Sequence, residues 1–465
     1  MLIAVVLVLL VVGSIIFHFM SPWWFTPIAS NWSTMDDTVI LTFWVTGIVF
    51  IAVNLFLAWA VIRYRHRKGQ KADYEPENKK LEWWLTIVTS IGVAAMLAPG
   101  LFVWGKFVVV PNEASVVEAV GQQWHWSFRF PGKDGALGKS DAKLISPANP
   151  FGVDPADPSG QDDVLIARPE LWLPLDQPVK VLLRSKDVLH NFTVPQFRVK
   201  MDLVPGMITY LWLTPTKAGE YEIMCEELCG LAHFAMRGRV VVVPQGEFDS
   251  WLAAQPTFGE MQALAAADPV AGAAQYAVCT ACHGPAGEGN HALNAPRLAG
   301  QQAWYVRRQL NNFRAGLRGA HEKDTFGAQM KAFAAMLPDD TAIRNLAAYV
   351  ETLPGHASEA TVTGNVKRGK SLYTTCAACH GANGQGIWAL NGPRLEGAHD
   401  WYLVRQLQNF QQRIRGAHHQ DFYGWQMGAM SDILADDRAI NDIVSYINTL
   451  RPVDTRTAMT AGRGN

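Results

Sequence analysis

Two short cysteine motifs in the C-terminal half of the sequence carry the strongest chemical signal. Residues 279–283 read CTACH, and residues 376–380 read CAACH. In a C-x-x-C-H motif the two thiols attach a haem covalently, and the histidine becomes an axial ligand of its iron. A lone C-x-x-C pair also suits zinc or a redox dithiol, but repetition of the whole motif favours haem. The sequence therefore predicts two haem c groups, attached by Cys279, Cys282 and His283 and by Cys376, Cys379 and His380.

Each predicted haem needs a second axial ligand further along the chain. Met330 lies 47 residues after His283 (330 minus 283), and Met427 lies 47 residues after His380 (427 minus 380). A thioether opposite an imidazole raises the reduction potential, which suits an electron carrier. We therefore expect Met330 and Met427 to be these ligands. The alternatives are two nearby methionines, or a matched pair of histidines that would give bis-histidine ligation: Met336, Met430, His321 and His418.

A second metal motif occupies residues 225–236, which read CEELCGLAHFAM. It offers two thiolates, an imidazole and a thioether: Cys225, Cys229, His233 and Met236. Soft sulfur combined with imidazole favours copper, whereas a thioether is a poor ligand for a structural zinc ion. A mononuclear blue-copper site needs only one cysteine, so two cysteines indicate a pair of bridged copper ions. His190, which precedes Cys225 by 35 residues, is the candidate for a second imidazole.

The region that carries the haem motifs is an internal duplication. The two motifs are offset by 97 residues (376 minus 279), and several further matches share that offset, among them Asn294–Leu298 with Asn391–Leu395. A constant offset indicates two copies of one helical domain. We expect these two domains at 268–355 and 365–452, with a polar hinge over 355–364. The residues from about Val453 onward are polar, and we expect them to be disordered.

Three apolar stretches near the N-terminus predict transmembrane helices at about 1–20, 39–62 and 83–104, within a region 1–106. Each is long enough to cross a hydrocarbon core of ~30 Å. The first stretch could be a signal peptide, but it lacks a basic start and a cleavage site, and the aromatic segment 21–25 follows it, so a retained helix is favoured. Seven lysines and arginines lie between the second and third stretches, which predicts a cytoplasmic loop and places all that follows residue 104 outside the membrane.

Residues 107–250 form the predicted copper domain. Short β-branched runs, such as 179–184 and 237–243, alternate with turn-rich segments and predict an antiparallel β-sandwich or barrel. Residues 253–274 are rich in alanine and predict a linker with one helix at most. The fold class is thus multidomain: transmembrane α-helices, an all-β sandwich and two all-α domains.

Composition agrees with a membrane or cofactor protein. Charged residues make up only 17% of the chain, and tryptophan occurs 17 times. The formal net charge of -1 gives no case for nucleic-acid binding. The six cysteines form three close pairs, and each pair has a metal or haem role available, so no structural disulfide is expected.

The copper motif and its surroundings resemble cytochrome c oxidase subunit II. The pattern C-x-E-x-C-x-x-x-H-x-x-M is similar to that family's dinuclear copper A loop, and residues 39–244 resemble its two-helix hairpin followed by a Greek-key cupredoxin domain. Residues 121–126 match the family's G-x-Q-W-x-W segment, with His125 where an aromatic residue is usual. The C-terminal part resembles dihaem cytochromes c, and the first apolar stretch is extra to the usual hairpin.

The resemblance implies a role for each site residue. Cys225 and Cys229 would bridge the two copper ions. The remaining ligands would be the side chains of three residues and one backbone carbonyl: His190, His233, Met236 and the carbonyl of Glu227. The Glu227 side chain would reach a magnesium ion shared with subunit I. Trp124 would lie between the incoming electron and copper, whereas Trp126 is expected in the sandwich core. Glu82 would lie near the mouth of a proton channel, or be an ordinary interfacial carboxylate.

The function implied is that of the electron-accepting subunit of a proton-pumping terminal oxidase in the bacterial inner membrane, with its copper and haem domains in the periplasm. Electrons would pass from reduced cytochrome c, or from a quinol-oxidising complex, to subunit I, where oxygen is reduced to water. Subunit III and membrane lipid are further expected partners. The alternatives are an electron-transfer subunit of another membrane reductase, such as one for nitrogen oxides, and a copper-storage protein, for which two haem domains would be pointless.

Overall fold

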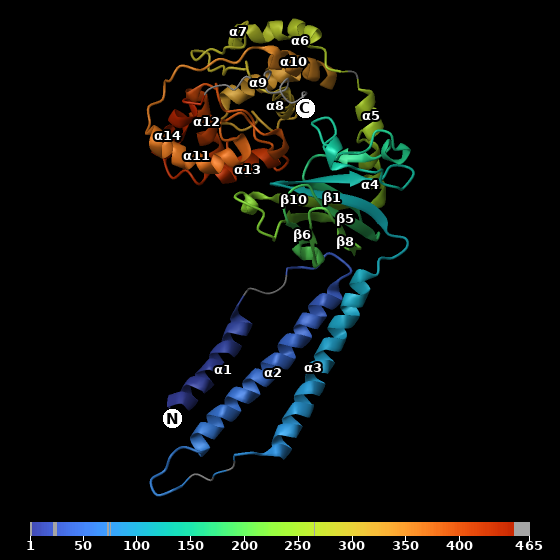
Figure 1. Ribbon diagram of the computed structural model, residues 1–465, viewed down its shortest axis with the longest axis vertical. Coiled ribbons are helices and arrows are strands. Elements are labelled where there is room, and N and C mark those ends of the chain that lie inside the picture. Colours follow the sequence, from blue (N-terminus) through green and yellow to red (C-terminus); the bar gives the residue numbers. More distant parts are fainter. Residues whose placement is uncertain (1, 22–25, 72–73, 75, 265, 451–465) are drawn as a thin grey trace, which may run out of the picture.

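The structure, a computed structural model, describes residues 2–21, 26–71, 74, 76–264 and 266–450. Three helices project from one side of a β-sandwich, and two helical units lie on the other side (Figure 1). Most of the aromatic segment at 21–25 and the C-terminal residues expected to be disordered lie outside the described residues. The three classes of structure predicted from the sequence are all present.

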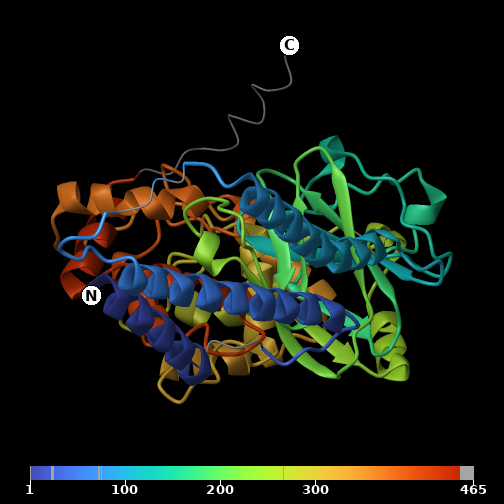
Figure 2. The same cartoon turned by 90° about the horizontal axis from the view of Figure 1, so that it is seen from below.

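The projecting helices are α1 (Leu2–Met20), α2 (Ser33–Arg63) and α3 (Lys79–Val108). All three are long and apolar enough to cross a membrane. Helices α2 and α3 extend beyond the predicted 39–62 and 83–104, because their polar flanking residues continue the helical backbone past the apolar stretch. Helix α1 lies beside α2 along part of its length (Figure 2).

The sandwich contains two five-stranded sheets. One has the order β3-β2-β1-β5-β8 and the other β4-β10-β9-β6-β7. Their strands are β1 (Ser115–Gln122), β2 (His125–Phe130), β3 (Val164–Ile166), β4 (Glu170–Pro174), β5 (Val179–Ser185), β6 (His190–Val194), β7 (Val199–Leu203), β8 (Ile208–Leu213), β9 (Gly219–Met224) and β10 (Arg237–Val243). The sequence predicted antiparallel pairing, but β1 pairs with β5 and β4 with β10 in parallel. Each of these pairs joins strands that are distant in sequence, which leaves enough connecting chain for a parallel arrangement.

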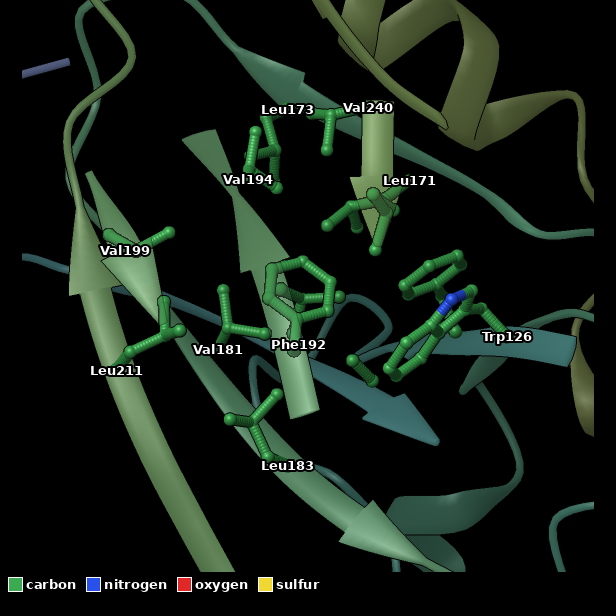
Figure 3. Packing of buried hydrophobic residues seen from close by; sticks show 14 of the residues in the cluster. Trp126, Leu171, Leu173, Val181, Leu183, Phe192, Val194, Val199, Leu211 and Val240 are labelled. Carbon is green, nitrogen blue, oxygen red and sulfur yellow. The ribbon is translucent and has the colours of Figure 1, made fainter. Parts of the chain in front are cut away.

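Large apolar side chains fill the space between the sheets. Trp126 from β2 and Phe192 from β6 meet edge to face, with ring centroids 5.6 Å apart (Figure 3). Both are fully buried, so the expectation that Trp126 belongs to the core is confirmed. This packing fixes β6, and with it His190 at the start of that strand.

The first turn of α2 is attached to the sandwich. The Arg198 guanidinium binds the Asp36 carboxylate through two nitrogens, at 2.6 and 2.9 Å. Trp32, just before α2, is buried in the sandwich core, and its indole donates to the carbonyl of Trp212. The position of the copper domain relative to the helices is therefore held by buried contacts as well as by the chain connection.

The alanine-rich segment after the sandwich is more ordered than a linker. Helix α4 (Gln245–Ala253) precedes it, and it contains α5 (Phe258–Ala263) and part of α6 (Pro269–Tyr276). The Phe258 ring is fully buried against Val120 and Phe151 of the sandwich. The alanine-rich composition of the segment did not reveal this contact, because a single aromatic residue makes it.

The two helical units repeat the same elements. The first has α6, α7 (Thr280–His283), α8 (Ala303–Arg314), α9 (Thr325–Ala335) and α10 (Asp340–Thr352). The second has α11 (Val366–His380), α12 (Asp400–Gln411), α13 (Phe422–Ser431) and α14 (Asp437–Ile447). Asp339 and Asp436, which lie at equivalent positions of the two units, are helix caps: Asp339 accepts from the amide of Ala342, and Asp436 from that of Ala439. We call these units the first and second repeats.

Candidate functional site

The predicted copper ligands come together at one end of the sandwich. Residues 225–236 form the connection between β9 and β10, and His190 is the first residue of β6. Strand β6 pairs with β9, so the register of the sheet brings His190 towards Cys225. Sequence spacing alone could not show this pairing.

The ligand atoms lie within a few ångströms of one another. The Cys225 Sγ is 3.7 Å from the Cys229 Sγ and 3.9 Å from His190 Nδ1. The Cys229 Sγ is 3.5 Å from His233 Nδ1 and 3.7 Å from the Met236 Sδ. The Glu227 carbonyl oxygen lies 3.2 Å from the Cys225 Sγ. Two central sulfurs are thus flanked by one imidazole each, with a thioether on one side and a carbonyl on the other, and this donor set fits a bridged pair of copper ions.

The two thiols are electrostatically coupled. The contact with Cys229 lowers the pKa of Cys225, and the same contact raises the pKa of Cys229. The pair therefore favours a state in which one sulfur is a thiolate that accepts from the other. A metal needs both sulfurs deprotonated, so metal binding would release the remaining proton.

Asp187 holds the His190 ring, a role that the sequence did not reveal. The Asp187 carboxylate lies 2.8 Å from His190 Nε2, which leaves Nδ1 facing Cys225. Burial opposes protonation of this imidazole, but the hydrogen bonds to Asp187 and Cys225 outweigh it and raise the pKa of His190. Metal-binding histidines usually have such an acceptor on the second nitrogen. The only indication of this role in the sequence is the Asp-x-x-His spacing, in which Asp187 precedes His190 by three residues.

Trp124 lies directly against the copper loop. Its indole nitrogen donates to the Cys229 carbonyl at 3.1 Å, and the Gln123 side-chain amide donates to the same oxygen at 2.7 Å. Gly230 follows with φ of +120°, and a Cβ there would lie 3.0 Å from the Trp124 ring. The glycine therefore allows the indole to pack on the loop.

A cavity in each repeat contains the predicted haem-binding side chains. The cavity of the second repeat is bordered by Cys376, Cys379, His380 and Met427. The cavity of the first repeat is bordered by Cys279, His283 and Met330, with Cys282 in the helical turn before the histidine. The predominantly apolar walls and the sulfur and imidazole donors fit a haem in each cavity.

A backbone carbonyl orients each axial histidine. His283 Nδ1 lies 2.8 Å from the Pro296 carbonyl oxygen, and His380 Nδ1 lies 2.7 Å from that of Pro393. Burial lowers the pKa of both imidazoles, so the rings are neutral and Nε2 is free to bind iron. This explains why the Asn-x-Pro-Arg-Leu segment recurs with the haem motif. The repetition was visible in the sequence, but its purpose was not.

The structure also separates the alternative axial ligands. Met336 is 70% exposed and borders neither cavity, and His321 and His418 border neither cavity. Met430 borders the cavity of the second repeat together with Met427, but its counterpart in the first repeat is Phe333. The equivalent positions of Met330 and Met427 therefore fit the iron best.

The two predicted carboxylates lie in different places. Glu82 is exposed in the first turn of α3, far along the chain from the copper loop. The Glu227 side chain is half-buried at the copper loop, and its neighbour Glu226 forms an ion pair with Lys200 at 2.9 Å. Neither carboxylate belongs to a cluster of metal-binding side chains within the described part of this chain, where His190, Cys225 and Cys229 form such a group.

The two repeats face each other with approximate two-fold symmetry. The Arg318 guanidinium donates to Gln309 in its own repeat and to Gln406 in the other. Arg415, its counterpart, donates to Gln406 and Gln309 in the same way. Both glutamines border both cavities, so the two haem sites are adjacent.

Comparison with known families gives matches to both kinds of domain. The family described as cytochrome C oxidase subunit II, periplasmic domain, matches residues 115–243. The cytochrome c family matches residues 269–354 and 366–451. The first match covers the sandwich with its copper loop, and the others cover the two repeats.

Several individual proteins are similar to parts of this chain. An alternative cytochrome c oxidase subunit 2 from Bradyrhizobium diazoefficiens is 57% identical over 258 residues, which is 56% of this chain and 93% of the relative. A cytochrome c oxidase subunit 2 from Cereibacter sphaeroides is 27% identical over 235 residues, 49% of this chain and 77% of the relative. Among solved structures, reduced cytochrome c4 from Pseudomonas stutzeri matches with a TM-score of 0.33 and 27% identity, covering 40% of this chain and 100% of that one.

The family matches imply copper A in the sandwich and haem c in the repeats, and the three apolar helices together with the periplasmic domain indicate an inner-membrane protein whose sandwich faces the periplasm. The match to the Bradyrhizobium relative is long and 57% identical, and the predicted copper ligands lie together at the end of the matched sandwich. This chain therefore belongs to the cytochrome c oxidase subunit II family, and it carries two cytochrome c domains in addition.

Proposed function

We propose that this chain is the electron-accepting subunit of a proton-pumping terminal cytochrome c oxidase. It passes electrons from a reduced donor, through its two haem-binding repeats and its copper domain, to subunit I, where oxygen is reduced to water. The observation that carries the proposal is the copper site. Two cysteine sulfurs 3.7 Å apart, each with an imidazole beside it, form a ligand set for two copper ions in a domain of the subunit II family.

The copper ligands are assigned from their contacts. Cys225 and Cys229 would hold the two copper ions together, with His190 and His233 facing them through Nδ1. Met236 and the Glu227 carbonyl would supply the weak outer donors. When bound, the copper pair would supply one-electron chemistry, and a buried, prearranged ligand set would limit the rearrangement that accompanies each transfer.

The haem sites are assigned in the same way. Cys279 and Cys282 would attach one haem, and His283 and Met330 would be its axial ligands. Cys376 and Cys379 would attach the other, and His380 and Met427 would be its axial ligands. The Pro296 and Pro393 carbonyls accept from Nδ1 and so favour the tautomer that would present Nε2 to iron.

Three further roles depend on the partner subunits. The Glu227 side chain contributes to a magnesium site shared with subunit I, and Trp124 lies on the route into copper. Glu82 is near the mouth of a proton channel on the cytoplasmic side, since it begins the helix that follows the basic loop. The partners proposed are subunit I, subunit III, membrane lipid and a donor that is cytochrome c or a quinol-oxidising complex. The protein crosses the membrane several times.

Purification in mild detergent with identification of the partners and their metals tests the proposal. We expect two covalent haems by haem staining of a denaturing gel, two copper ions in this chain by metal analysis, and a co-purifying subunit that contains haem and a third copper. One haem per chain, or zinc in place of copper, would contradict the site assignments. A partner that reduces a nitrogen oxide would instead show that the chain serves another membrane reductase.

A further inference from the structure

The second repeat is fixed to the copper domain beside the copper loop. The Gln426 side-chain amide donates to the Trp124 carbonyl at 2.7 Å, and the Tyr423 hydroxyl donates to the Ala167 carbonyl at 3.1 Å. The Asn391 amide lies 3.0 Å from His125 Nδ1. Figure 1 shows α13, which carries Gln426 and Tyr423, facing the sandwich, and α13 also contacts the short helix His233–Ala235 of the copper loop.

Apolar contacts join the haem cavity of this repeat to the copper site. Cys379, a haem-attaching cysteine, and Met430 pack against the core cluster that contains Cys229 and Met236. Ala232, which directly precedes the copper ligand His233, borders the cavity of the second repeat. One residue of the copper loop is therefore also a wall of the haem site.

The first repeat has no such relation to copper. All the described residues that border its cavity lie between Tyr276 and Asn409, outside the sandwich. In the first repeat, two of the residues equivalent to those that contact the copper domain are exposed to solvent. Gln329, the counterpart of Gln426, is exposed, and Phe333, the counterpart of Met430, is 47% exposed.

We propose an order for the two haem sites: the second repeat delivers electrons to copper, and the first repeat receives them from the external donor. The proposal rests on the proposed function. Trp124 is only 5% exposed and lies against the second repeat, so a soluble carrier has no access to this face of the copper domain. The surface through which an external donor would otherwise reach copper is occupied by a domain of the same chain.

The proposed step is the transfer of a single electron. The iron held by His380 is oxidised from Fe(II) to Fe(III), and the copper pair held by Cys225 and Cys229 is reduced by one electron. No bond forms or breaks, and no further reactant is needed. Gln426 acts as a positioning residue, because it contacts the protein on the copper side and no reacting atom.

Changing the potential of one haem at a time tests the order in the purified complex without oxygen. A photoexcited ruthenium complex injects single electrons, and absorbance follows each haem and the copper pair. Met427→His lowers the potential of the second haem, because imidazole stabilises ferric iron more than thioether does. Transfer of an electron from the first haem to the second then becomes energetically unfavourable. A potential lowered by ~59 mV reduces the equilibrium population of the reduced second haem about tenfold, so we expect the electron to reach copper at least about tenfold more slowly.

Met330→His is the matched control. It lowers the potential of the first haem only, so the transfer from the second haem to copper should keep its wild-type rate. The order would be overturned if Met330→His slowed the arrival of electrons at copper and Met427→His did not. Equal slowing in both variants would also overturn it. If no electron passes from either haem to copper in the wild-type complex, the proposed function fails instead.

A second pair of variants tests the contact itself. Gln426→Ala removes the bonds to the Trp124 and Ala235 carbonyls, whereas Gln329→Ala makes the same change at the equivalent, exposed position. We expect Gln426→Ala to increase hydrogen exchange around Trp124 and to slow copper reduction severalfold, with unchanged haem and copper potentials. Gln329→Ala should change neither quantity. Identical exchange and rates in the two variants would show that the contact does not position the donor.

Discussion

At the scale of single residues, His190 is held from both sides. Its Nδ1 faces Cys225, and its Nε2 contacts Asp187, which also accepts from the backbone amides of Gln123 and Val188. Asp187→Ala removes all these acceptors, and loss of such an outer partner typically lowers metal affinity ~10–100-fold. We therefore expect weaker copper binding, measured by competition with a chelator. Asp187→Asn keeps an acceptor oxygen and should lose much less, so equal losses in the two variants would contradict this account.

Met236 provides a second residue-scale prediction. Its side chain is fully buried, with Sδ 3.7 Å from the Cys229 Sγ. Met236→Leu nearly conserves volume and should cost under ~1.5 kcal/mol of stability. Because a weak thioether donor tunes the potential more than it holds the metal, copper should still bind, with a shifted absorption spectrum and potential. An unchanged spectrum and an unchanged rate of haem reoxidation would make Met236 a packing residue only.

The side chains of these sites could be predicted from the sequence, since their types and spacings are demanded by the chemistry. Their supporting groups could not. Pro296 and Pro393 act through backbone carbonyls, which no side-chain pattern reveals. The Asp-x-x-His spacing was visible, but it did not show that Asp187 contacts Nε2 of His190. The equal spacing in the two repeats favoured Met330 over Met336, and the position of each side chain relative to the cavity supports that choice.

At the scale of elements, a buried charge cluster joins three strands of the copper domain. The Glu118 carboxylate of β1 binds Arg129 of β2 at 2.9 Å and Arg184 of β5 at 2.8 Å. Glu118→Gln leaves two guanidinium groups without this counter-charge, and breaking a buried pair costs ~3–5 kcal/mol. We expect a clearly lower denaturation midpoint. Glu222→Gln is the control: its pair with Arg237 is exposed, and such pairs contribute ~0–1 kcal/mol. Similar losses in both variants would show that burial is not the cause.

The connections between elements were the least predictable part of the fold. The segment 355–364 has the polar, glycine-containing composition of a free hinge. In the structure, the Asp400 carboxylate accepts from the amides of Thr361 and Val362, and the Ser358 hydroxyl donates to the Gly397 carbonyl. The parallel pairing of β1 with β5 was similarly hidden, because strand patterning shows which face is buried but not which strand is the neighbour.

At the scale of the whole molecule, Glu82 lies at the opposite end of α3 from the sandwich (Figure 1). Under the proposed function, a carboxylate there would take up protons from the cytoplasmic side, away from the copper and haem sites. Glu82→Gln should therefore slow oxygen turnover while leaving haem and copper reduction intact. Glu77→Gln is the control, since Glu77 precedes the helix in an exposed pair with Lys79. Wild-type turnover of Glu82→Gln across the pH range would make Glu82 an interfacial anchor.

Under the proposed function, the contact between the second repeat and the copper domain would change the kinetic order of electron delivery. A diffusing carrier meets its acceptor in a bimolecular encounter, whose rate depends on carrier concentration and falls with ionic strength when charges steer the approach. The second repeat belongs to the same chain and already lies against Trp124, so transfer from it to copper would need no bimolecular encounter. Copper reduction from the second repeat should consequently be first order, with a rate constant that stays the same on dilution or on addition of salt. Only the encounter at the first repeat should respond to carrier concentration and ionic strength.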